Sequence, residues 1–166
     1  MTSYAALPKG GEWFNQGSFA EEFRGTKAGE MLAPKSERPT TIVGGGGADH
    51  LFSTEGKTTF KYNRLSDSLS TRPDIIFSFN PKMDKIDISD VLRKAGIEKI
   101  NYVPSGQELK NIGDGYLSVD SLRMTTLRVK VKNHGPDFMI KIDGTSVGER
   151  HIIESKNKPV GPISCY

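Results

Sequence analysis

The sequence predicts an all-β protein in which a short glycine-rich β-roll remnant is followed by an antiparallel β-sandwich, with one short helix. Three observations predict this fold. The 166 residues suit one domain, and their 18 Gly and 9 Pro favour turns over long helices. Short apolar runs separated by turn residues begin at Thr40. A nine-residue glycine repeat opens this region.

Residues 1–40 are predicted to be a flexible leader. They are rich in Gly, Pro, Ser, Thr and Glu, and their five Lys and Arg are cancelled by five Glu. Such a composition favours an extension over a packed core. Trp13, Phe14, Phe19 and Phe23 form one apolar cluster that suits docking. The leader is therefore interpreted either as a targeting or docking segment or as a plain unstructured extension. The β domain is expected at residues 41–155 and a loose tail at 156–166.

The glycine repeat begins at Gly44. Residues 44–52, GGGGADHLF, have the form G-G-x-G-x-D-x-L-x of the calcium-binding β-roll repeat. Glycine allows the positive φ angles that aim backbone carbonyls at a cation, and Asp49 adds a charged oxygen. A second copy nine residues on has Thr58 in place of the Asp. Because a solenoid needs about three copies to bury a core, the roll is predicted to be a remnant.

Four carboxylate residues lie in and around the next two predicted strands: Asp67, Asp74, Asp84 and Asp87. Side-chain oxygens and loop carbonyls at strand edges are the donors expected for Ca²⁺, which takes about 6 to 8 oxygen ligands. The alternative is that Asp67 and Asp74 cap turns while Asp84 and Asp87 solvate a strand end. Spacing alone favours this alternative.

The order of the motifs resembles a known family. G-G-x-G-A-D-x-L, F-x-Y, S-D-S, D-x-I-x-x-F and D-K-I-D-I-S follow one another as in the C-terminal domain of serralysin-type secreted metalloproteases. The series also resembles the R-modules of mannuronan epimerases. The resemblance implies a calcium-binding β-roll joined to a β-sandwich and export by a type I secretion system. It implies these calcium ligands: the turn carbonyls of Gly45 and Gly47, and the carboxylates of Asp49, Asp67, Asp74 and Asp84.

The downstream sequence continues the pattern. Residues 89–96 predict a short helix with Ser89 as N-cap and Gly96 after its C-terminus. Residues 115–120, 125–132 and 137–144 predict three strands. In the second of these, Leu127 and Val129 should face one side and Arg128 the other, as in a sheet with one buried face.

Catalysis is not predicted. The sequence has no H-E-x-x-H motif, and its three histidines are scattered. The glycines at 44–47 are followed by Ala48 and Asp49 rather than by Lys and Ser or Thr, which excludes a phosphate-binding P-loop. Cys165 is the single cysteine, so no internal disulfide is possible. No membrane span and no secretory signal peptide are predicted.

The charge balance gives little support for a polyanion partner. The formal net charge is +3, from 23 Lys and Arg against 20 Asp and Glu, so no nucleic-acid partner is predicted. Arg128, Lys130 and Lys132 form a basic strip that suits an acidic polysaccharide, although an ordinary solvated face is favoured. We thus expect a non-catalytic, extracellular calcium-binding β module, exported by a non-Sec route, that binds a host or matrix component. The alternative is a carbohydrate-binding or effector-like module with a decayed calcium site.

Overall fold

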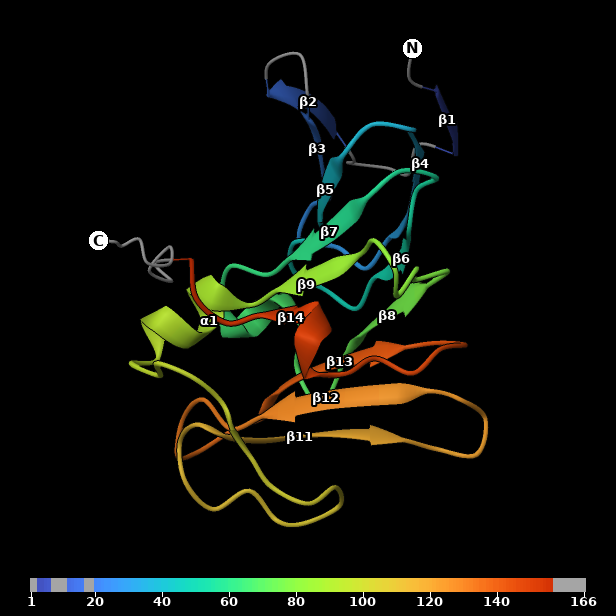
Figure 1. Cartoon of the computed structure of the whole chain (residues 1–166). Coiled ribbons are helices and arrows are strands. Elements are labelled where there is room, and N and C mark those ends of the chain that lie inside the picture. Colours follow the sequence, from blue (N-terminus) through green and yellow to red (C-terminus); the bar gives the residue numbers. More distant parts are fainter. Residues whose placement is uncertain (1–2, 7–11, 17–19, 157–166) are drawn as a thin grey trace, which may run out of the picture.

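The structure is a computed structural model that describes residues 3–6, 12–16 and 20–156. In this part of the chain the strands form two sheets (Figure 1). The eight-stranded first sheet has the spatial order β1 (Ser3–Ala6), β4 (Met31–Lys35), β6 (His50–Phe52), β8 (Asp74–Phe77), β13 (Phe138–Ile142), β12 (Thr125–Val129), β11 (Asp114–Val119) and β10 (Asn101–Tyr102). The six-stranded second sheet has the order β14 (Ile152–Ile153), β9 (Lys85–Asp87), β7 (Thr58–Lys61), β5 (Thr40–Val43), β3 (Ala20–Arg24) and β2 (Glu12–Gln16).

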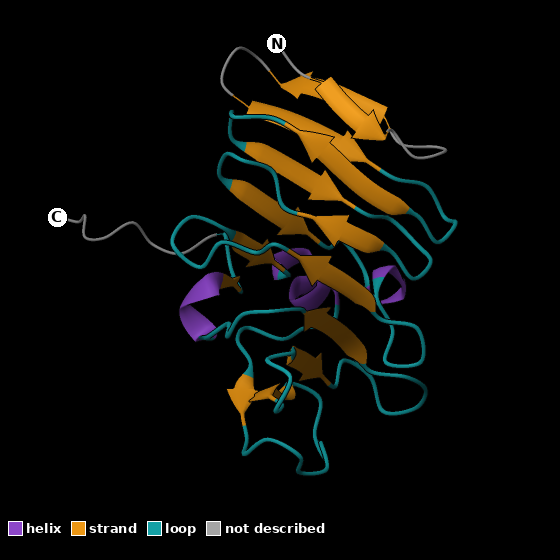
Figure 2. Ribbon diagram, turned by 90° about the vertical axis from the view of Figure 1, so that its right-hand side faces the viewer, coloured by secondary structure: helices purple, strands orange, loops and turns teal. Residues whose placement is uncertain are grey.

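From β3 to β9 the chain forms a parallel coil, by which we mean residues 20–87. Successive strands alternate between the two sheets, so β3, β5, β7 and β9 lie in the second sheet and β4, β6 and β8 in the first. Neighbours within each sheet are parallel, with Leu51 opposite Ile76 and Ile42 opposite Phe60. The strands stack as layers along the molecule (Figure 2). Each parallel connection therefore passes through a strand of the opposite sheet, which supplies the long crossover that parallel pairing requires.

The C-terminal part continues the first sheet. β13 pairs in parallel with β8, and β12 lies antiparallel to both of its neighbours, β13 and β11 (Figure 1). These three strands confirm the strands predicted at residues 115–120, 125–132 and 137–144. Two single-turn 3₁₀ helices, Leu65–Asp67 and Glu149–His151, lie in the connections. None of the helices in the described residues is long and apolar enough to cross a membrane.

The short helix predicted from the sequence is α1 (Ser89–Lys94). Gly96 has a φ of 74°, and its N–H donates to the Arg93 carbonyl at 3.1 Å, as expected for a residue that follows a helix end. The N-cap is Ile88 rather than Ser89. Ser89 is instead inside the helix, where its N–H and hydroxyl donate to Oδ1 of Asp87 at 3.0 and 2.6 Å.

The core lies between the two sheets and follows the alternation of each strand. Inward-facing residues have no exposed surface, among them Phe23, Leu32, Ile42, Leu51, Phe60, Ile76, Ile86, Leu127, Val129, Phe138, Ile140 and Ile142. Burial of each such side chain contributes about 1.5–3 kcal/mol to stability. Tyr62 and Phe138 meet edge to face at 5.4 Å between ring centroids. This contact joins the parallel coil to the C-terminal strands.

The prediction of an all-β protein is confirmed, but the sheets are mixed rather than antiparallel. The parallel coil also has more layers than a two-copy remnant, because β3 and β4 extend it toward the N-terminus. Inward and outward side chains alternate in parallel and antiparallel strands alike, so the apolar pattern found the strands without showing their direction.

The boundary expected at residue 40 does not coincide with a structural boundary. Residues 20–35, expected within a flexible leader, contribute strands β3 and β4, and Phe23 and Leu32 are fully buried. Each of these strands buries only a few side chains, and the turn between them, residues 25–30, is polar and exposed. The average composition of residues 20–35 therefore resembles that of an unstructured extension. A targeting or docking role of the leader stays a prediction. Of the expected tail, residues 157–166 lie outside the described residues.

Candidate metal centre

Three carboxylates stack along one edge of the parallel coil. Glu30 and Asp49 directly precede β4 and β6, and Asp74 is the first residue of β8. The pairing of Met31 with His50 and of His50 with Ile75 places the three carboxylates one above another. We call Glu30, Asp49 and Asp74 the acidic edge.

Backbone hydrogen bonds link the members of the acidic edge. The N–H of Glu30 donates to Oδ1 of Asp49, and the N–H of Asp49 donates to Oδ1 of Asp74, each at 2.9 Å. Each Asp carboxylate therefore accepts a hydrogen bond from the backbone at the start of the strand stacked before it. Both Asp side chains are completely buried.

The second oxygen of each Asp has no donor. Oδ2 of Asp49 and Oδ2 of Asp74 are buried, and neither has a hydrogen-bond partner in the described part of the protein. An ionised carboxylate in such a site is costly unless a donor or a cation compensates it. Burial raises the pKa of Asp49 to about 7, although its hydrogen bond from Glu30 opposes the rise. Burial, followed by the charge of Asp49, raises the pKa of Asp74 to about 9.

Tyr62 adds a third orphaned group to this region. It is 1% exposed, and its hydroxyl makes no hydrogen bond of good geometry with the described residues, but it lies close enough to Asp74 to lower the pKa of that carboxyl. Burial raises the pKa of the hydroxyl well above its ordinary value, and the charge of Asp74 raises it further. The sequence pattern predicts only that Tyr62 is an alternating strand residue, and it does not predict a buried hydroxyl beside the two carboxyls.

The glycine turn packs directly against the layer above it. Gly45 and Gly47 have φ angles of 84° and 87°. A Cβ on Gly45 would lie 2.3 Å from the carbonyl oxygen of Thr26, and one on Gly44 would lie 2.7 Å from Oδ2 of Asp49. The structure thus confirms the positive φ predicted for this turn. The absence of a Cβ at Gly44 therefore leaves room for the orphaned Asp49 oxygen.

Glu30 was missed in the sequence analysis. It follows Gly25 by five residues, as Asp49 follows Gly44, so the turn before β4 is a degenerate copy of the glycine repeat. The Glu30 carboxylate accepts from the N–H of Thr26 at 2.7 Å and from its hydroxyl at 2.9 Å. The spacing was the available signal, but Thr26 and Lys27 stand where the intact copy has glycines.

Asp67 and Asp84 have hydrogen-bond donors of their own. Oδ2 of Asp67 accepts from the N–H groups of Asn63 and Arg64 at 2.9 and 3.2 Å, so this side chain caps a turn. Its charge also contributes to the raised pKa of Asp49, Asp74 and Tyr62, so it lies near all three. Asp84 precedes β9 in the second sheet, on the opposite edge of the coil. The structure therefore brings Asp49 and Asp74 together and places Asp84 elsewhere.

The predicted basic strip lies on β12 and the residues that follow it. Nε of Arg128 is 2.8 Å from Oδ2 of Asp137, so a carboxylate offsets this charge. Lys130 donates to the carbonyl of Asn133 at 3.4 Å, and Lys132 is exposed. Within the described residues, neither lysine forms an ion pair.

The residues of the acidic edge fit a calcium ion. Ca²⁺ prefers oxygen ligands, and two buried carboxylate oxygens here lack any donor. In the described part of the chain no group of three or more His, Cys, Asp or Glu side chains could hold a metal by itself. Backbone carbonyls of the glycine turn would have to complete the coordination, as in other oxygen-ligated Ca²⁺ sites.

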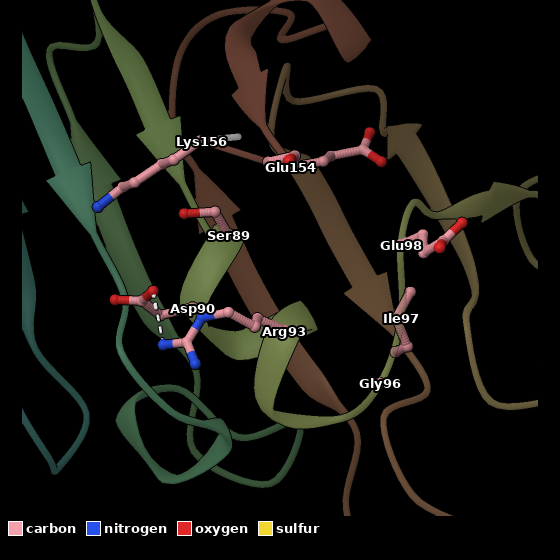
Figure 3. Close-up of a pocket in the computed structure, with 9 residues that line it drawn as sticks. Ser89, Asp90, Arg93, Gly96, Ile97, Glu98, Glu154 and Lys156 are labelled. Atoms are coloured by element: carbon pink, nitrogen blue, oxygen red, sulfur yellow. Dashed lines mark hydrogen bonds and ion pairs between the residues drawn. The ribbon is translucent and has the colours of Figure 1, made fainter. Parts of the chain in front are cut away.

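A hollow of about 710 Å³ lies elsewhere, between α1 and the segment after β14 (Figure 3). Arg93 pairs with Asp90 at 3.1 Å, and Lys61 pairs with the same carboxylate at 3.4 Å. None of the residues predicted as calcium ligands lines this hollow. Its lining residues are Ser89, Asp90, Arg93, Gly96, Ile97, Glu98, Glu154, Ser155 and Lys156.

The family model described as Peptidase M10 serralysin C terminal matches residues 38–154. No curated protein matches the chain. Among solved structures, the AlgE6R3 subunit of the Azotobacter vinelandii mannuronan C5-epimerase is similar, with a TM-score of 0.56 and 22% identity over 87% of this chain and 86% of that one. The AlgE6R2 subunit of that enzyme has a TM-score of 0.56 and 20% identity over 88% of this chain and 98% of that one.

Proposed function

The chain belongs to the Peptidase M10 serralysin C-terminal family, and we propose that it is a calcium-binding β module without catalytic activity of its own. In this proposal the parallel coil is a calcium β-roll, and its glycine turn and acidic edge hold the ion. The observation that carries the proposal is the pair of buried, unpartnered oxygens on Asp49 and Asp74. A divalent cation beside them would compensate two charges that burial otherwise makes unfavourable.

The proposed calcium binding also indicates where the module functions. We propose that it acts outside the cell and is exported by a type I system, in keeping with the secreted proteases for which its family is named. Where free Ca²⁺ is scarce, no cation compensates Asp49 and Asp74, whose charged forms burial disfavours. Where Ca²⁺ is abundant, binding to the folded state stabilises it by mass action.

For the partner, we propose a host or matrix component. Lys130 and Lys132, which lack ion pairs among the described residues, make an acidic polysaccharide the first ligand to test. The second candidate function is a carbohydrate-binding or effector-like module whose calcium site has decayed. It is favoured by Thr58, a hydroxyl residue at the position where the repeat has an Asp.

A thermal melt tests the calcium proposal. The midpoint is measured in EDTA, in Ca²⁺ and in Mg²⁺ at equal ionic strength. With Ca²⁺ at about 100 times Kd, binding adds ~2.7 kcal/mol, which raises the midpoint of a chain of this size by roughly 5 to 10 °C. Mg²⁺ should have a smaller effect, because it demands a tight octahedral site. An identical midpoint in EDTA and Ca²⁺ would favour the decayed-site alternative.

A further inference from the structure

The edge of the parallel coil opposite the acidic edge is built from hydroxyl side chains. We call Ser53, Thr54, Thr58 and Asp84 the hydroxyl edge. Thr58 opens β7, and Asp84 directly precedes β9, whose Lys85 lies opposite Thr59. Asp84 therefore stacks on Thr58 in the second sheet as Asp74 stacks on Asp49 in the first.

Asp84 and Asp74 make the same backbone contact. The N–H of Thr58 donates to Oδ1 of Asp84 at 2.9 Å, and the N–H of Asp49 donates to Oδ1 of Asp74 at 2.9 Å. Both Asp side chains are 0% exposed. The two residues thus form a matched pair in burial and in their contact with the preceding layer.

The second carboxylate oxygen distinguishes them. Oδ2 of Asp84 accepts from the hydroxyl of Ser53 at 2.5 Å and from the N–H of Asn80 at 2.8 Å. Oδ2 of Asp74 accepts from no described group. Hydrogen bonds from the protein therefore compensate the Asp84 carboxylate, whereas Asp74 has an oxygen still free for a ligand.

The hydroxyl of Thr58 fills the interior of its own turn. It accepts from the N–H of Thr54 at 3.0 Å and lies 2.8 Å from the Thr54 hydroxyl. It also lies within hydrogen-bond distance of the Gly56 carbonyl and of the Ser53 hydroxyl, at 3.2 and 3.1 Å. A buried polar network in which each member has partners is stable without an ion.

We propose that the coil binds its cation at the acidic edge alone and that the hydroxyl edge is a metal-independent clasp. This inference rests on the proposed calcium function. A cation at Asp84 would have to displace donors from Ser53, Asn80 or Thr58. A cation at Asp49 and Asp74 breaks no formed hydrogen bond to either Oδ2 atom, and the hydroxyl of Tyr62 is the donor that lies near Asp74. Calcium then compensates the carboxylates of the acidic edge, whereas hydrogen bonds from the protein already compensate Asp84 at the hydroxyl edge.

The experiment compares Asp84→Asn with its matched control Asp74→Asn in the full chain. Calcium binding is measured by isothermal titration, and amide hydrogen exchange is followed by NMR in EDTA and in Ca²⁺. Asp84→Asn should leave the stoichiometry unchanged and alter Kd by no more than about twofold, whereas Asp74→Asn should weaken binding by more than about tenfold. In the wild type, both amides are hydrogen-bonded without an ion, so protection of the Thr58 amide should be equal in the two buffers, whereas protection of the Asp49 amide should increase further with Ca²⁺.

Thr58→Val provides a second test, because it keeps both carboxylates and removes the central hydroxyl of the clasp. It should lower the thermal midpoint in EDTA and leave calcium binding as in the wild type. If Asp84→Asn does not fold, calcium binding by Thr58→Val tests the proposal in its place. Loss of a bound ion, or binding about tenfold weaker, in either variant would overturn the one-edge proposal. A wild type that binds no calcium would overturn the proposed function instead.

Discussion

The N–H of Asp49 donates to Oδ1 of Asp74 at 2.9 Å, which joins two residues 25 positions apart in sequence. This bond orients the Asp74 carboxyl and brings a second buried carboxyl next to it. Both acids have a raised pKa, because burial disfavours their charged forms. The metal-free protein therefore holds protons at a site that we propose for calcium.

The first prediction concerns the pH dependence of the metal-free protein. The pKa is about 7 for Asp49 and about 9 for Asp74 in the folded state, against about 3.9 for an unfolded Asp. The folded state thus binds more protons than the unfolded state between these values. The contribution of both groups to stability is complete below about pH 4 and is lost as pH rises through about 7 and 9.

In EDTA, the thermal midpoint should therefore decrease from about pH 5 to about pH 9. Added Ca²⁺ should reduce the loss, because it binds the deprotonated pair. Asp74→Asn is the control, since it cannot lose this proton and should show a flatter profile. A midpoint that rises with pH over the same range in EDTA would contradict the assignment.

The second prediction concerns the glycine turn. Gly45→Ala should destabilise the protein by about 1–3 kcal/mol or more, because alanine disfavours positive φ and its Cβ would lie 2.3 Å from the Thr26 carbonyl oxygen. Gly46→Ala is the matched control, since the nearest atom to its Cβ is Lys27 Cα at 3.5 Å. It should change stability by no more than about 0.5 kcal/mol. Urea unfolding measures both, and equal losses would show that the turn does not stack as described.

The third prediction tests the acidic-polysaccharide partner. The double variant Lys130→Ala/Lys132→Ala should elute from immobilised heparin at lower NaCl than the wild type. The control is Lys94→Ala/Lys99→Ala, which removes the same net charge from exposed positions on α1 and the loop after it. Specific binding at the strip predicts a larger shift for the first variant. Equal shifts would mean that heparin binding depends only on the net charge of the protein, an attraction that salt screens equally in the two variants.

Much of the fold was predictable because it depends on local patterns. The alternation of Leu127 and Val129 with Arg128 indicated a half-buried strand, and all three residues lie as predicted. Gly96 marked the end of α1. The ordered motifs from Gly44 to Ser89 identified the family, because each motif occupies a turn or strand start with its own backbone requirement.

The partners of each strand were not predictable in the same way. Copies nine residues apart, with Leu51 and Phe60 at equivalent positions, lie in opposite sheets, and the stacked partner of Leu51 is Ile76. An insertion with a 3₁₀ helix, Leu65–Asp67, separates β7 from β8 and breaks the period. Sequence spacing therefore could not show which carboxylates share an edge.

The sequence by itself determined that this protein is built from strands, that its glycine turn adopts positive φ, and that Asp49 and Asp74 carry ligand-type oxygens. Only the tertiary structure decided that these two acids meet with unpartnered oxygens, while the hydroxyl of Ser53 and the backbone N–H of Thr58 donate to Asp84. The physical reason is that strand alternation and turn conformation depend on neighbouring residues. Hydrogen-bond donors, in contrast, reach a buried carboxylate from layers far away in sequence.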